Sequence, residues 1–95
     1  MTELRPPFDE AKLTLIRDFL REHFPAHNRR ESFDFERTAQ RFTLERGSYN
    51  RHGLIVPQET LDDEDLFFLL NDQLVDALKL AGAMPVILTR QGPRY

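Results

Sequence analysis

The chain has 95 residues, no cysteine and a formal net charge of −3. Its length fits one domain, which we expect to span residues 1–95 with 1–7 and 91–95 flexible. The lack of cysteine excludes disulfide bonds and thiolate-ligated zinc, and the longest apolar run, residues 66–70, is too short to cross a membrane. The N-terminal residues lack the basic and apolar regions of a signal peptide, so we expect a soluble, cytoplasmic protein.

The first predicted element is a helix over residues 9–23. Apolar residues recur there at the spacing of one buried helical face: Ala11, Leu15, Ile16, Phe19 and Leu20. Asp9 is the expected N-cap. Phe24 precedes Pro25, and a residue before proline is disfavoured in the helical region, so the helix ends there.

Residues 30–47 fit a β-hairpin better than a helix. A turn over 37–40 places Phe35 opposite Phe42. The same register makes one further apolar pair and two pairs of opposite charge: Phe33 with Leu44, Glu31 with Arg46, and Glu36 with Arg41. A helix with Phe35, Ala39 and Phe42 on one face is the alternative, because the turn contains neither glycine nor asparagine.

The remaining chain predicts a loop, a strand, a long helix and a last strand. Residues 47–53 form the loop, bounded by two glycines, and 54–56 the strand, which Pro57 ends. The second helix spans 62–81, with Thr60 in a capping box before four acidic residues and Gly82 at its end. Its inner face carries Phe67, Leu70 and Leu74. Residues 85–89 form the last strand.

This order of elements, α-β-β-β-α followed by a last strand, predicts an α+β fold. Two amphipathic helices need a surface to cover, and one face of an antiparallel sheet provides it. We therefore expect a two-layer sandwich with both helices packed on the same face of the sheet.

Phe68 and Val75 are the predicted interface residues. They are one heptad apart on the back of the second helix, opposite its buried stripe. In a small domain, few layers are available to cover both faces of a helix. The pair therefore indicates self-association or another protein partner, with coverage by the last strand as the alternative.

The segment 29–52 indicates two alternative functions. Residues 28–53 contain six arginines and four acidic residues. A nucleic-acid-binding or transcription-associated domain would use side chains of this segment: Arg37, Arg41, Arg46, Tyr49, Arg51 and His52. A small-ligand site or an enzyme built around the 48–53 loop is the second alternative.

No pattern predicts a catalytic residue, a cofactor or a metal. His23 and His27 have the spacing of two helical ligands, but Pro25 between them breaks that geometry. The acidic run 62–65 suits a helix N-terminus and lacks the glycine and spacing of a calcium loop. The leading interpretation is therefore a non-enzymatic binding module, homodimeric and not associated with a membrane.

Overall fold

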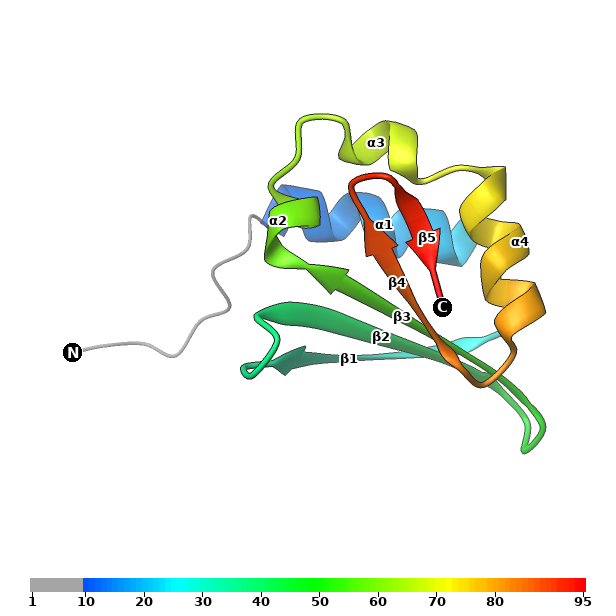
Figure 1. Ribbon diagram of the computed structural model, residues 1–95. Coiled ribbons are helices and arrows are strands. Elements are labelled where there is room, and N and C mark those ends of the chain that lie inside the picture. Colours follow the sequence, from blue (N-terminus) through cyan, green and yellow to red (C-terminus); the bar gives the residue numbers. More distant parts are fainter. Residues whose placement is uncertain (1–9) are drawn as a thin grey trace.

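The computed structural model describes residues 10–95, and in them an α+β fold combines helices with a five-stranded sheet (Figure 1). The strand order is β1-β2-β3-β4-β5. The elements are α1 (Glu10–His23), β1 (Asn28–Asp34), β2 (Ala39–Arg46), β3 (Asn50–Pro57), α2 (Gln58–Leu61), α3 (Leu66–Leu69), α4 (Asp72–Ala81), β4 (Pro85–Thr89) and β5 (Gly92–Arg94). The α+β class is as predicted. Residues 1–7 and the expected N-cap Asp9 lie outside the described residues.

The sheet is mixed, which corrects the expectation of an antiparallel one. Strands β1, β2 and β3 follow one another as antiparallel neighbours, and β5 returns antiparallel to β4. Strand β4 runs parallel to β3. The connection from β3 to β4 carries α2, α3 and α4 and is long enough to bring the chain back to the starting end of β3, as a parallel pairing requires.

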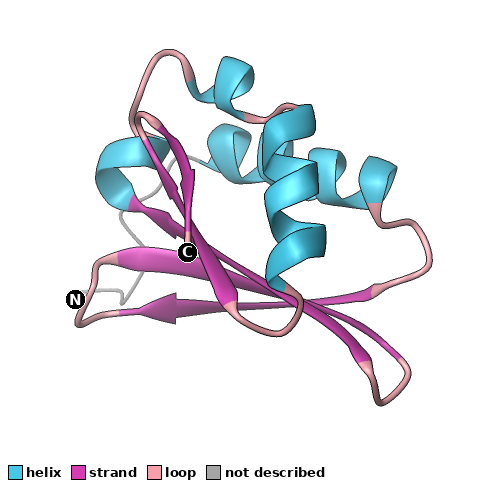
Figure 2. Ribbon diagram, turned by 45° about the vertical axis from the view of Figure 1, so that its right-hand side comes forward, coloured by secondary structure: helices cyan, strands magenta, loops and turns pink. Residues whose placement is uncertain are grey.

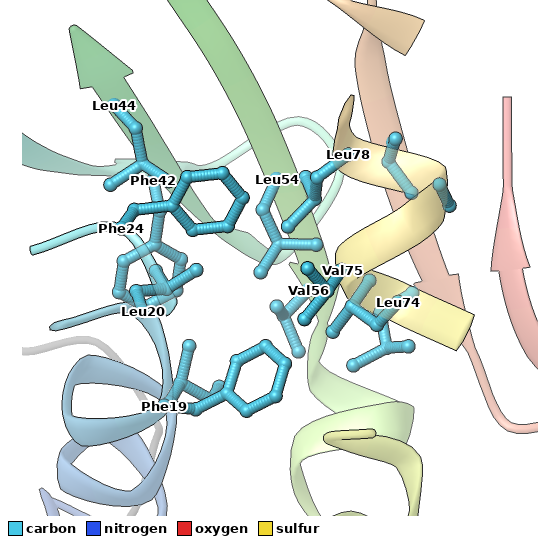
Figure 3. Packing of buried hydrophobic residues seen from close by; sticks show 14 of the residues in the cluster. Phe19, Leu20, Phe24, Phe42, Leu44, Leu54, Val56, Leu74, Val75 and Leu78 are labelled. Carbon is cyan, nitrogen blue, oxygen red and sulfur yellow. The ribbon is translucent and has the colours of Figure 1, made fainter. Parts of the chain in front are cut away.

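The hydrophobic core combines side chains of α1 and α4 with those of one sheet face (Figure 3). Phe42, Leu54 and Val86 occupy one cross-strand row of this face and are at most 1% exposed. Helix α1 contributes Ile16, and α4 contributes Leu78, both fully buried. Figure 2 shows the helices beside the strongly twisted strands of the sheet.

The predicted hairpin exists, but its register is wrong by four residues. Phe42 is opposite Glu31, and Asp34 is opposite Ala39. The turn starts early because the Asp34 side chain accepts hydrogen bonds from the Glu36 and Arg37 backbone N–H groups, at 3.1 and 3.2 Å. Phe35 therefore lies in the turn, where it is 68% exposed.

The expected charge pairs of the hairpin are also replaced. Glu31 accepts two hydrogen bonds from the Arg17 guanidinium of α1, each at 2.9 Å. It also forms an ion pair with Arg29 at 3.1 Å. Glu10 also pairs with Arg17. Hydrogen bonds to Glu31 and then Glu10 raise the pKa of the Arg17 guanidinium above its ordinary value. This cluster connects α1 to β1.

The second helix is not continuous over 62–81. Asn71 has an extended backbone, and its side-chain oxygen accepts hydrogen bonds from the Gln73 and Leu74 N–H groups. It therefore caps α4 and separates it from α3. The expected capping box is also wrong, because Thr60 lies inside α2 and is buried. Gly82 ends α4 as predicted, with a positive φ of 58°.

Two loop predictions are wrong at their boundaries. Residues 50–53 belong to β3 rather than to a loop, so the connection between β2 and β3 is a tight turn over residues 47–49. Gly47 begins this turn with a positive φ of 68°. Residues 92–94, expected in a flexible tail, form β5 against β4. The Thr89 hydroxyl donates to the Gly92 carbonyl at 2.7 Å and supports the turn between these strands.

Candidate functional site

Helix α3 presents two adjacent phenylalanines to solvent. Phe67 is 66% exposed and Phe68 is 71% exposed, and their rings meet edge to face with centroids 5.8 Å apart. Leu15 of α1, which was predicted to be buried, is also exposed, and Leu70 is half-buried at the margin of the core. We call these four residues the aromatic patch. Clustered aromatic side chains of this kind mark interaction surfaces more often than single exposed apolar residues do.

An apolar hollow lies within the patch, between α1 and α3. It has a volume of about 230 Å³, and its apolar walls come from Leu15, Phe19, Phe67 and Leu70. Its remaining lining residues are polar: Asp18, Glu22 and His23. Pockets for small organic ligands usually measure about 300–1,000 Å³. The hollow therefore has room for a single projecting side chain and is bordered by a polar rim.

The expectation that Phe68 and Val75 share an exposed face is wrong for Val75. Val75 is 7% exposed and packs beside Leu74 in the core (Figure 3). Phe68 is exposed, so the last strand does not cover it. The break at Asn71 rotates α3 relative to α4, which also exposes Phe67 instead of burying it with Leu74. Asn71 was the sequence signal for this break, because asparagine is a favoured N-cap.

The structure brings together two of the arginines expected to contact nucleic acid. Arg41 and Arg51 line one hollow on the sheet face opposite the core. Arg37 lies in the turn between β1 and β2, where its side chain pairs with Asp34 at 3.7 Å. The other two candidates are near the β2–β3 turn, at the far end of the strands: Arg46 and the fully exposed Tyr49. They do not converge on one site.

His52 is not on a polar loop. Its side chain faces the core from β3 and is 8% exposed. The Leu78 carbonyl oxygen can only accept, so the His52 Nδ1–H donates to it at 2.8 Å. The His52 ring also packs against Phe24 and His27, with centroids 5.2 and 5.4 Å apart. These contacts attach β3 to α4 and to the segment between α1 and β1, and they bury the imidazole.

The other titratable clusters have structural partners. Asp63 accepts a hydrogen bond from the Asp65 N–H at 2.8 Å and pairs with Arg90 at 2.7 Å, and these contacts lower its pKa. His27 bonds Asn50 through Nε2, while its buried Nδ1 has no hydrogen-bond partner within the described part of the chain. Residues 10–95 hold no group of three potential metal-ligating side chains and no helix able to span a membrane.

Comparison with protein-family models, with curated proteins and with solved structures gives no match to this chain. Two surfaces of the described residues stand out: the aromatic patch on the helices and the arginine-lined hollow on the sheet.

Proposed function

We propose that the protein is a non-enzymatic binding module that forms a homodimer through the aromatic patch. The observation that carries the proposal is the exposure of two contacting phenylalanines beside an apolar hollow. Side chains of this size are costly to leave in water, since burying each one stabilises a complex by about 1.5–3 kcal/mol.

A second copy of the chain is the partner that suits the patch. In a two-fold dimer both copies use the same surface. If a residue of one copy contacts a site on the second copy, the same residue of the second copy contacts that site on the first. The patch supplies both halves of such a contact, because Phe68 projects and the hollow beside Phe67 receives. In the proposed dimer, Phe68 of each copy enters the hollow of the other, and the polar rim surrounds both rings.

The expected affinity is modest. Four buried rings contribute on the order of 6–12 kcal/mol. Association costs about 4–15 kcal/mol in lost translational, rotational and side-chain freedom. The net gain is therefore at most about 8 kcal/mol, which corresponds to a dissociation constant in the micromolar range or weaker. Because the attraction is apolar, the dimer should persist at high salt, where a charge-driven assembly weakens.

The test compares two substitutions that place the same charge on the surface. Phe68→Glu puts a carboxylate inside the proposed interface, whereas Leu80→Glu replaces a side chain that is 78% exposed on α4, outside the patch. Light scattering coupled to size exclusion gives the mass of each variant, and circular dichroism reports its fold. We expect a folded Phe68→Glu monomer and a Leu80→Glu dimer. A wild-type monomer at millimolar concentration, or a dimeric Phe68→Glu protein, would contradict the proposal.

A further inference from the structure

Gly53 occupies a position in β3 that does not require glycine. It lies between Thr43 of β2 and Pro85 of β4, in the middle of the sheet. Its φ is not in the left-handed region. A Cβ atom added there would approach Pro85 at 3.4–3.5 Å, which is ordinary van der Waals contact. Glycine weakens a strand interior, and it marks a bulge, a bend, or a site where a ligand or another backbone approaches closely.

The missing side chain leaves a hollow in the sheet face opposite the core. Side chains alternate between the faces along a strand, so Gly53 and Ile55 face away from Leu54 and the core. The hollow measures about 200 Å³, and Gly53, Ile55, Thr43 and Pro85 are among its lining residues. Ile55 is only 2% exposed and gives the hollow an apolar floor.

Two arginines bracket this hollow. Arg41 is the cross-strand partner of Ile55, and Arg51 lies two residues before Gly53 on the same face. Arg51 is 3.7 Å from Glu45, whereas Arg41 has no ion-pair partner in residues 10–95. Within the described chain, no acidic residue lines the hollow. Guanidinium groups bind phosphate and carboxylate oxygens through charge-assisted hydrogen bonds.

We propose that this hollow binds a small organic oxyanion, a phosphate or a carboxylate attached to an apolar group. The apolar group lies on Gly53 and Ile55, and the oxyanion is held by Arg41 with Arg51. The volume of the hollow limits the size of the ligand, because pockets for drug-sized organic ligands start at about 300 Å³. The site is on the other face of the sheet from the core and does not depend on the aromatic patch.

The experiment is an amide NMR titration with three single-ring probes: phenyl phosphate, benzoate and phenol. Binding in the hollow should shift the amide signals of Thr43, Gly53 and Ile55, with a dissociation constant on the order of 1 mM for the better oxyanion. Phenol, which lacks the charge, should bind at least about tenfold more weakly. Comparison of phenyl phosphate with benzoate identifies which oxyanion the arginines prefer.

Three variants locate the site. Gly53→Val fills the hollow and should abolish binding, and Arg41→Gln should weaken it about tenfold. Arg46→Gln removes an arginine from the opposite face of the same strand and should leave binding unchanged. If neither oxyanion shifts these amides at about 10 mM, or if Arg41→Gln binds as the wild type does, the proposal is wrong. A further outcome would also overturn the proposal. If the small probes do not bind, and a single-stranded oligonucleotide binds both the wild type and a folded Gly53→Val protein, the surface binds nucleic acid instead.

Discussion

Asn71 is the residue that separates α3 from α4, and its replacement by alanine should measurably destabilise the protein. Its side-chain oxygen accepts from the Gln73 and Leu74 N–H groups at 3.0 and 3.3 Å, and its Nδ2 donates to the Phe68 carbonyl at 2.7 Å. Loss of an N-cap costs about 0.5–2 kcal/mol. The bond to Phe68 adds about 0.5–1 kcal/mol, the low end for a solvent-exposed hydrogen bond. We therefore expect a total loss of about 1–3 kcal/mol.

Urea denaturation followed by circular dichroism measures this loss. Asn71→Asp keeps the capping oxygen and replaces the donor to Phe68 with a carboxylate oxygen, which can only accept. Because the cap is retained, this variant should cost less than Asn71→Ala, by about 1 kcal/mol. Gln73→Ala is the control, because this exposed neighbour has no side-chain hydrogen bond within the described residues. An Asn71→Ala protein within about 0.5 kcal/mol of wild type would refute the capping role, as would equal losses for the two Asn71 variants.

The remaining stability predictions use the same denaturation assay. Leu78→Ala, at a fully buried position, should cost about 2–5 kcal/mol, whereas Leu80→Ala, at a position 78% exposed, should stay within about 0.5 kcal/mol of wild type. Glu31→Gln should cost about 1–2 kcal/mol because two arginines lose their shared carboxylate, while Asp18→Asn in an exposed pair should cost less than about 0.5 kcal/mol. The pKa of Asp63 is lowered in the folded protein, so its carboxylate adds stability that is complete above the ordinary pKa of 3.8 and is lost as the pH falls through the pKa in the folded state. In the Asp63→Asn variant, the free energy of unfolding should therefore fall less steeply over this acidic pH range.

The sequence predicted the elements with strong local signals. Helix α1 and strand β4 follow from apolar spacing and flanking prolines, and the structure places them within one residue of the expected boundaries. The α+β class follows from the order of such elements. The hairpin was also predicted, because Phe33 and Phe35, and then Phe42 and Leu44, alternate with polar residues.

The errors came from side chains that bond to the backbone. Asp34 forms a turn that competes with the pairing of Phe35 and Phe42, and nothing in the apolar pattern records that competition. Asn71 likewise interrupts a 3-4-3-4 apolar spacing that is otherwise typical of one long helix. Helix and strand propensity and apolar periodicity predict element boundaries poorly where one side-chain hydrogen bond to the backbone can end the element.

The candidate sites were less predictable than the fold. Phe68 was identified because it falls outside the helical stripe, whereas Leu15 and Phe67 join it only through the break at Asn71 and the packing of α1. Arg41 and Arg51 are ten positions apart in sequence, and only the β2–β3 register places them around Gly53. Cross-strand neighbours of this kind cannot be obtained until the register is known.

The most direct test of the proposed dimer is a filtered nuclear Overhauser experiment on a mixture of labelled and unlabelled protein. It detects only contacts between two copies of the chain. We predict signals from the Phe68 ring of one copy to the methyl groups of Leu15 and Leu70 in the other, because those leucines line the hollow that receives the ring. Absence of any signal between copies at millimolar concentration, or signals only from the sheet face around Ile55, would contradict a dimer formed through the aromatic patch.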